Sequence, residues 1–292
     1  MRNSSSSSSP MTRRDLLAAG LAAAGGLAIA AGQTRAATLQ TENGGYGPFK
    51  MGLQSYSLRG FKTPDGKMDF ETALAKTQEL GIKYWESFNG HIPLLTDPEA
   101  VLAVKKKLDA HGVTVLGYGV IHFGKNADEN KRLFDFGKMM GLRYFSADPD
   151  PDSFDQLDHL VEQYQIAVGI HNHGPGHRYA KIDTIAAAVK DHHELIGLCN
   201  DTGHFLRSRE DPVRAVEVFG KRTYGVHLKD VKDASKFTIL GQGDLRLGEM
   251  LKKLADLHYN YCLALEYEEN EKAPIDDIRA CLAAAKKAAA AL

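Results

Sequence analysis

Short apolar runs alternate with helix-spaced apolar stripes along most of the chain. Apolar residues recur at intervals of three and four over 70–77, 101–108 and 247–254, as on one face of a helix, and Gly112 is placed to end the second of these helices. Eight runs rich in β-branched and aromatic residues begin near Met51, Lys83, Thr114, Arg143, Ile166, Ile196, Thr223 and Tyr261. The spacing, roughly 23 to 38 residues, is that of repeated strand and helix units.

Eight such units form either a closed (β/α)8 TIM barrel or an open, doubly wound sheet. Connections between parallel strands are right-handed in both folds, so handedness does not separate them. A doubly wound nucleotide-binding sheet would place a Gly-x-Gly-x-x-Gly turn before its first helix, and the sequence has none there. We therefore expect a single closed α/β barrel over residues 50–292.

The N-terminus has the order of an export signal. A serine run precedes Arg13 and Arg14, an Ala/Gly-rich apolar stretch follows over 16–32, and small residues at Ala36 and Ala37 mark a cleavage site. The paired arginines favour the twin-arginine route, although Asp15 follows them. We predict a signal segment over 1–37, a linker over 38–49 and a periplasmic or secreted protein, with retention as an uncleaved anchor as the alternative.

Length and charge narrow the class of protein further. Cleavage after Ala37 would leave a chain close to the ~250 residues of one closed barrel. The formal net charge of the whole chain is −1, and the signal carries four arginines and one aspartate, so the remainder is more acidic. This balance argues against a nucleic-acid partner. The three cysteines, Cys199, Cys262 and Cys281, lie in apolar segments and are expected to be core thiols.

Metal-binding residue types gather where the later strands end. Runs five to eight finish in His171-Asn172-His173, Asp201-Thr202-Gly203-His204, His227-Leu228-Lys229 and Glu266-Tyr267-Glu268. In a closed barrel the carboxyl ends of the strands meet at one face, and neighbouring strands lie about 4.8 Å apart. Four side chains at equal height can therefore converge on one ion.

A single histidine in a strand is more often a hydrogen-bonded structural residue than a ligand. A carboxylate that ends an apolar strand, as Glu266 does, nevertheless needs a partner, and a shared cation supplies one. We predict a divalent metal held by His171, Asp201, His227 and Glu266, with His173 as the replacement for His171. Two carboxylates with two imidazoles suit Mn²⁺, Co²⁺, Fe²⁺ or Zn²⁺ better than Ca²⁺.

At these residues the sequence resembles the xylose-isomerase-like barrel superfamily, which includes ketose 3-epimerases, inosose dehydratases and endonuclease IV. The resemblance spans nearly the whole chain after the signal. Its motifs stand, in order, at 52–59, 84–86, 201–204, 226–230, 240–244 and 265–266. It implies a metal-dependent enzyme, with Asp201, His227 and Glu266 as metal ligands and His204 in contact with a substrate oxygen.

One departure from the family pattern bears on the reaction. In the epimerases the position of His171 resembles a glutamate that binds metal and exchanges protons with the substrate, opposite the glutamate of the last strand. Epimerisation by proton transfer needs two such bases on opposite faces. With histidine here, the candidate bases are Glu266, His173 and Glu86, and a single base fits isomerisation or β-elimination.

Four further residues are candidate substrate contacts. They are Trp85, His122, His204 and Lys229. His122 could instead only seal the barrel, Lys229 could form a salt bridge facing a helix, and Glu86 could be a structural carboxylate behind the site. Asp148, Asp150 and Asp152, in a loop interrupted by proline, are expected to be solvated.

We therefore predict a divalent-metal-dependent sugar isomerase or epimerase that removes the proton next to a carbonyl. Export and the lack of an Arg/Lys cluster in the last two loops favour an unphosphorylated sugar as its small-molecule partner. The first alternative is a lyase or dehydratase that eliminates a β-substituent from a keto sugar or 3-keto glycoside. A non-catalytic sugar-binding protein is the second alternative, and phosphodiester cleavage is disfavoured by charge and compartment. After signal cleavage no stable membrane span is expected, and a homo-oligomer remains open.

Overall fold

The structure, a computed structural model, describes residues 44–292 of the 292-residue chain. The predicted signal over 1–37 and the first part of the predicted linker lie outside the described residues. Within the described part, no helix has both the length and the apolar character needed to cross a bilayer. The predicted export route and compartment remain predictions.

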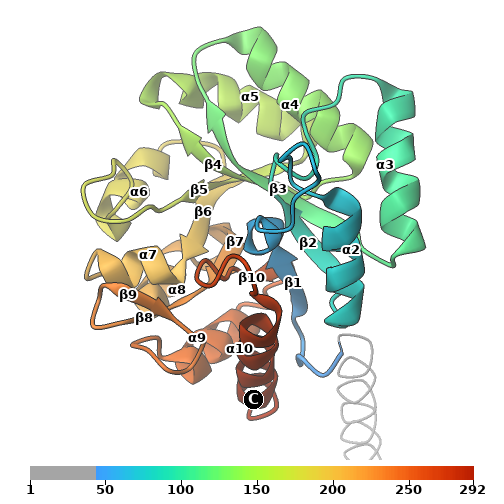
Figure 1. Ribbon diagram of the computed structural model, residues 1–292. Coiled ribbons are helices and arrows are strands. Elements are labelled where there is room, and N and C mark those ends of the chain that lie inside the picture. The colour runs from blue at the N-terminus through green and yellow to red at the C-terminus, as the bar shows by residue number, and fades with distance from the viewer. Residues whose placement is uncertain (1–43) are drawn as a thin grey trace, which may run out of the picture.

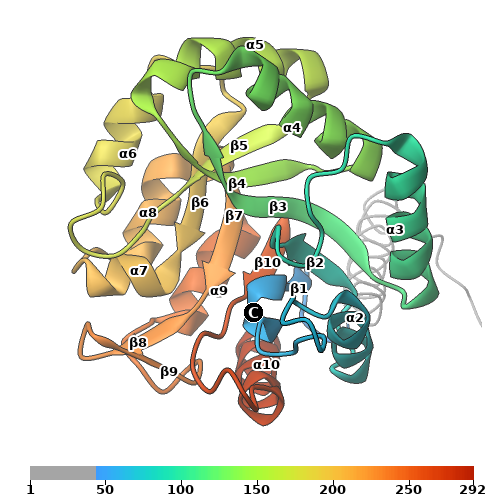
Figure 2. The same ribbon diagram turned by 45° about the horizontal axis from the view of Figure 1, so that its top comes forward.

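Eight parallel strands close into a barrel, with helices around the outside (Figure 1, Figure 2). Around the barrel the order is β1-β10-β7-β6-β5-β4-β3-β2, so consecutive strands of the chain are neighbours. The strands are β1 (Lys50–Gln54), β2 (Tyr84–Ser87), β3 (Thr114–Phe123), β4 (Tyr144–Pro149), β5 (Ala167–His171), β6 (Ile196–Asp201), β7 (Thr223–Leu228) and β10 (Cys262–Leu265). Each starts within one residue of a predicted apolar run, and the predicted TIM barrel is confirmed.

Helices cover the barrel between successive strands. The principal ones are α2 (Phe70–Glu79), α3 (Pro98–Ala110), α4 (Ala127–Met140), α5 (Phe154–Tyr164), α6 (Ile182–Val189), α7 (Thr202–Arg207), α8 (Pro212–Phe219), α9 (Leu247–Asp256) and α10 (Ile275–Ala289). Side chains of Asp69, Asp97 and Asn126 accept backbone N–H groups at the starts of α2, α3 and α4. These caps satisfy donors that a helix cannot pair internally, so they fix where each helix begins.

Strand alternation divides the core into two compartments. Phe145, Val168 and Leu198 face outward and pack under the helices, within the large apolar cluster. Tyr144, Ala167 and Cys262 face inward and fill the lower part of the barrel. All three cysteines are buried free thiols, as the sequence predicts. The interior is thus filled from below, and only its upper end is left for polar side chains.

A small hairpin extends the barrel after β7. It consists of β8 (Asp230–Lys232) and β9 (Lys236–Thr238). The Asp230 carboxylate accepts the backbone N–H groups of Gly241, Gly243 and Leu245 at 2.8, 3.1 and 2.9 Å. One buried charge therefore holds the loop that leads from the hairpin into α9.

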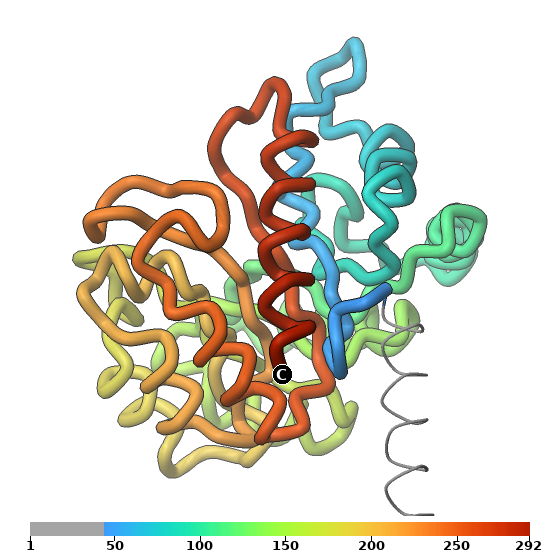
Figure 3. The backbone as a smooth tube through the Cα atoms, turned by 90° about the horizontal axis from the view of Figure 1, so that it is seen from below, coloured from blue at the N-terminus to red at the C-terminus, as the bar shows by residue number. Residues whose placement is uncertain are grey.

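The last residues of the predicted linker pack onto the barrel. Phe49 is fully buried and Tyr46 nearly so. Gly45 and Gly47 lie against Lys286 and Ala289 of α10, and the two ends of the described chain run side by side (Figure 3). These residues close the bottom of the barrel, opposite the face where the strands end.

Candidate metal centre

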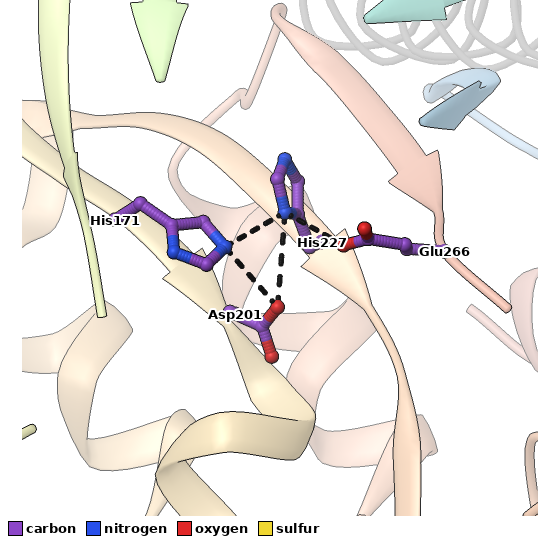
Figure 4. Close-up of side chains that lie close together, drawn as sticks. All are labelled: His171, Asp201, His227 and Glu266. Atoms are coloured by element: carbon purple, nitrogen blue, oxygen red, sulfur yellow. Dashed lines mark hydrogen bonds and ion pairs between the residues drawn. The ribbon is translucent and has the colours of Figure 1, made fainter. Parts of the chain in front are cut away.

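Four side chains from four neighbouring strands meet at the carboxyl end of the barrel (Figure 4). His171 ends β5, Asp201 ends β6, His227 lies near the end of β7 and Glu266 follows β10. Each occupies an inward-facing position of its strand. The residues two positions earlier, on the same face, are Gly169, Cys199, Gly225 and Ala264. All four predicted ligands are buried, between 0% and 8% exposed.

Their ligand atoms stand at the separations expected around one ion. His171 Nε2 lies 3.0 Å from His227 Nδ1 and 3.2 Å from Asp201 Oδ2. His227 Nδ1 lies 3.0 Å from a Glu266 oxygen and 3.7 Å from Asp201 Oδ2. Atoms held at about 2.1 Å from one ion lie about 3.0 Å apart at right angles and about 3.4 Å apart at tetrahedral angles.

Buried carboxylate oxygens mark the same point. Asp201 Oδ2 and Glu266 Oε2 are buried and make no regular hydrogen bond, although the ammonium of Lys229 lies 2.9 Å from each. Two buried carboxylates beside one ammonium leave negative charge that a cation would neutralise. The residues present therefore fit a divalent metal, and the mixed imidazole and carboxylate set is the one that the sequence predicts.

The charge states of His171 and Asp201 agree with this role. Burial lowers the pKa of His171 to about 3, so its imidazole is neutral and has a lone pair to donate. Burial would raise the pKa of Asp201, but Lys229 and His204 outweigh it and hold that pKa well below its usual range. The site thus presents a carboxylate and a neutral imidazole at neutral pH.

The charge state of His227 differs. Burial would lower the pKa of His227, but Cys199, Glu86 and Glu266 outweigh it and raise that pKa well above its usual value. His227 would therefore release a proton when a metal binds.

Glu86 lies directly behind His227 and does not face the cleft. Its Oε1 is 2.7 Å from His227 Nε2, and the carboxylate also accepts from Gln54, Tyr144 and Ser146. With its carboxylate surrounded by these donors and its side chain fully buried, Glu86 has no access to substrate. The prediction that it is a catalytic base is wrong. It is a positioning residue that leaves His227 Nδ1 directed at the metal position.

Two predicted substrate contacts lie elsewhere. Trp85 precedes Glu86 on β2 and therefore faces the helices, where its indole N–H donates to Thr77 in α2 at 2.9 Å. The side chain of His122 is 60% exposed, pairs with Asp150 and lines a separate depression beside α4. Both predictions of substrate contact are wrong, because strand alternation turns Trp85 outward and β3 carries His122 past the rim of the cleft.

Lys229 lies beside the candidate metal ligands. Its ammonium is 2.9 Å from Asp201 Oδ2, 2.9 Å from Glu266 Oε2 and in contact with Glu268. Burial would lower the pKa of Lys229, but Asp201, Glu266 and Glu268 outweigh it and raise that pKa well above its usual value. The side chain is a fixed cation and cannot act as a base. The alternative of a salt bridge facing a helix is not what the structure shows.

Two further histidines line the cleft beside His171. The His173 ring lies 4.6 Å from that of His171 and 5.8 Å from that of His204. Burial, with His177 and His204 nearby, lowers the pKa of His173 to about 4. His204 Nδ1 lies 3.1 Å from an Arg207 nitrogen, which leaves its Nε2 to carry a proton. The cleft thus holds one imidazole suited to accept a proton and one suited to donate a hydrogen bond.

The cleft itself has a volume of about 300 Å³, at the small end of the range for small-molecule sites. Tyr56 and Phe88 form an aromatic wall, with ring centres 5.0 Å apart. The other lining residues are Gln54, Gly119, Val120, His171, His173, His204, Lys229, Glu266 and Glu268.

Sequence reasoning missed several of these residues. Gln54 lies in the motif of the first strand, but the sequence predicts no function for it and does not indicate its contact with Glu86. Tyr144 and Ser146 look like ordinary strand residues. The two residues are two positions apart on β4 and therefore share one face of the strand. That face is known to point inward only once the barrel is known to be closed.

A closed barrel of eight parallel strands, with a buried His/Asp/Glu cluster that could hold a metal ion where the strands end, defines the class of (β/α)8 barrel enzymes. Within that class, the chain belongs to the xylose isomerase-like TIM barrel family, whose model matches residues 74–285. The resemblance stated from the motifs is confirmed, and so is the expectation of an enzyme.

The chain is similar to dehydratases in sequence and to an epimerase in fold. An inosose dehydratase from Clostridium botulinum is 27% identical over 135 residues, which cover 39% of this chain and 45% of that protein. A solved structure of an uncharacterized protein from Parabacteroides distasonis has a TM-score of 0.64 and 25% identity, covering 82% of this chain and 99% of the other. The 3-keto-D-glucoside 4-epimerase from E. coli has a TM-score of 0.59 and 13% identity, with coverage of 82% and 99%. The chain spans less than half the length of the curated dehydratase, and the last likeness shows the fold alone.

Proposed function

We propose that this protein removes the proton next to the carbonyl of an unphosphorylated keto or aldo sugar and returns it, giving an isomer or epimer. One observation carries the proposal. His171 and Glu266 of the ligand cluster, the neutral imidazole of His173 and the fixed cation of Lys229 all line one cleft of sugar-sized volume. An inosose dehydratase is similar to part of the sequence, and a 3-keto-D-glucoside 4-epimerase shares the fold, so both reaction types are compatible with this barrel.

The side chains of His171, Asp201, His227 and Glu266 would hold a divalent metal. Such a metal, when bound, polarises a carbonyl and stabilises the negative charge that develops when the neighbouring proton leaves. Glu86 keeps the His227 ring in the orientation and tautomer that this requires.

His173 is the proposed proton acceptor. It lines the cleft beside the ligand cluster and is unprotonated at neutral pH, while its lowered pKa makes it a weaker base than a free imidazole. Glu266 is the weaker candidate. Burial would raise the pKa of its carboxyl, but Lys229 and His227 outweigh it and lower that pKa, and a bound metal would compete for the same oxygen. Glu86 is excluded by its burial.

Lys229 and His204 are the proposed contacts to substrate oxygens. The Lys229 ammonium can stabilise an oxygen that becomes negative, and the His204 Nε2 proton can bind a hydroxyl. Among the described residues that line the cleft, Lys229 is the one Lys or Arg, and three carboxylates already surround it. A phosphate would find no free cation there, which supports an unphosphorylated sugar.

A single acceptor fits isomerisation most directly. His173 can take the proton from one carbon and return it to the next on the same face. Epimerisation needs a second carrier on the opposite face, and Glu268 is the carboxylate that lines the cleft outside the ligand set. Its carboxylate is already in contact with the Lys229 ammonium.

β-Elimination is a second candidate function. The specific observation in its favour is His204, whose Nε2 proton is available to a leaving oxygen while His173 accepts the proton from carbon. The histidine at position 171, in place of a second carboxylate base, and the partial match to an inosose dehydratase point the same way.

Proton NMR in deuterated water separates the two. Protein loaded with Mn²⁺ or Co²⁺ is incubated with a free ketohexose and, separately, with a 3-keto glycoside. Deuterium next to the carbonyl of a rearranged, intact sugar supports isomerisation, whereas loss of the β-substituent with a new alkene signal supports elimination. His173→Asn should abolish either reaction while His159→Asn, on the exposed side of α5, should not. Sugar binding without any exchange would overturn both and leave a binding protein.

We also propose export through the twin-arginine route, from the residue order over 1–37. Replacing Arg13 and Arg14 by lysine should retain the protein in the cytoplasm of a host with this pathway. Fractionation followed by immunoblotting measures it, and unchanged periplasmic protein would contradict the proposal.

A further inference from the structure

A second group of potential ligands lies next to the candidate metal centre. It consists of Asp148 at the end of β4 and of His173 and His177 in the segment that follows β5. One ligand atom of each lies within 4.8 Å of the others. None of the three belongs to the first ligand set, so the group is a separate cluster at the rim of the same cleft.

Two observations distinguish this group from an ordinary surface cluster. Asp148 Oδ1 is buried and has no hydrogen-bond partner, although the rest of its carboxylate contacts His177 Nε2 at 3.4 Å. By contrast, the carboxylate of Asp158, in a similar cluster under α5, is satisfied by His192 and by the backbone N–H of His193. Only the Asp148 group combines two imidazoles with an unpaired buried oxygen, among the clusters that the described residues form outside the barrel interior.

We infer that Asp148, His173 and His177 form a second binding site for a transition-metal cation, which inhibits the enzyme when filled. Two imidazoles and one carboxylate with an open fourth position suit Zn²⁺ and Co²⁺. Asp148 lies on β4, and His173 and His177 follow β5, its neighbour in the barrel, so the strand pairing brings the two segments together. The inhibitory part rests on the proposed function, because it requires His173 to be the proton acceptor.

The second site should be the weaker of the two. It has three ligands and is half-exposed, whereas the first has four and is buried. His177 Nδ1 also accepts a long bond of 3.4 Å from the Tyr179 N–H. Binding through Nε2 moves the ring proton to Nδ1, and that bond is then lost.

Filling the site removes the proton acceptor from the cleft. A histidine whose lone pair binds a cation cannot take a proton from carbon. We therefore expect activity to rise with the first equivalent of metal and to fall with the second.

Titration of the chelator-treated protein with Co²⁺ tests the binding directly, by visible absorption and equilibrium dialysis. The wild type should bind two equivalents, the second at least tenfold more weakly. His177→Ala and Asp148→Asn should bind one, and Asp201→Asn should lose the tight equivalent while it keeps the weak one. His159→Ala, an exposed histidine on α5, should still bind two. One equivalent in the wild type, or two in His177→Ala, would overturn the proposal.

Activity separates this proposal from the function on which it rests. In the NMR assay, excess Co²⁺ should inhibit the wild type at least tenfold and leave His177→Ala active. Two bound equivalents with no turnover at any metal concentration would refute the proposed function and the inhibition but keep the second site. Turnover that excess Co²⁺ does not inhibit would refute the inhibition and keep the function. Circular dichroism verifies that the variants are folded.

Discussion

Glu86 acts on the metal centre only through His227, which makes it the sharpest residue-scale test of the site. Glu86→Gln removes the charge that fixes the ring and places an amide among the donors Gln54, Tyr144 and Ser146. We expect metal affinity to fall about 10- to 100-fold. Competition with a chromogenic chelator measures it, and Glu129→Gln, at an exposed position of α4, is the matched control. Unchanged affinity would show that Glu86 does not position His227.

His91 gives a pH-dependent prediction away from the metal centre. Burial, with a smaller effect of Lys62, lowers the pKa of His91 to about 4. Between pH 6.5 and 4 the folded chain keeps this imidazole neutral while the unfolded chain protonates it, so stability is lost as the pH falls. From these pKa values, the loss between pH 6.5 and 4.5 is about 2 kcal/mol.

Urea unfolding of the wild type and of His91→Gln at both pH values measures this contribution. The variant should lose about 2 kcal/mol less than the wild type on acidification. Equal losses in the two proteins would show that His91 is not held neutral by its surroundings.

The hairpin and the loop that follows it form the element-scale case. Asp230 alone accepts three backbone N–H groups of this loop, from Gly241, Gly243 and Leu245. Asp230→Ala leaves these donors without their acceptor and should destabilise the protein by roughly 2 to 4 kcal/mol. Asp230→Asn keeps one acceptor oxygen, so its stability should lie between that of the wild type and that of Asp230→Ala.

Urea unfolding measures the stability, and hydrogen exchange at residues 241–245 shows whether the loss is local. Protection should drop there first, because the backbone N–H groups of Gly241, Gly243 and Leu245 lose their acceptor. If exchange at these residues matched the wild type, the carboxylate would not be what orders the loop.

Metal binding should be visible in the stability of the whole molecule. A cation that binds only the folded barrel, at a concentration of 100 times its Kd, adds about 2.7 kcal/mol. For a chain of this size that raises Tm by roughly 5 to 10 °C. Differential scanning calorimetry with Mn²⁺ or Co²⁺ measures the shift, and a chelator should reverse it. Asp201→Asn should remove most of it, and a folded wild type with no shift would argue against the metal centre.

At the scale of the whole molecule, much of the fold was readable from the sequence. The eight apolar runs and the helical stripes determine strands and helices locally, through side-chain periodicity. The cluster of His171, Asp201, His227 and Glu266 was also predictable, because polar residues that end buried strands must find partners and the strand ends of a barrel share one face.

Which residues face the cleft was decided only by the closed barrel. Trp85 and Glu86 are adjacent in the sequence, yet one lies under α2 and the other inside the barrel, and the sequence did not show that Gln54, Tyr144 and Ser146 would surround Glu86. The sequence also did not predict that Asp148 would contact His177, or that Lys229 would contact three carboxylates. Side-chain periodicity is a local property, so the sequence by itself determines the strands and helices. Contacts between side chains on different strands depend on the strand register and on closure of the barrel, which exist only in the tertiary structure.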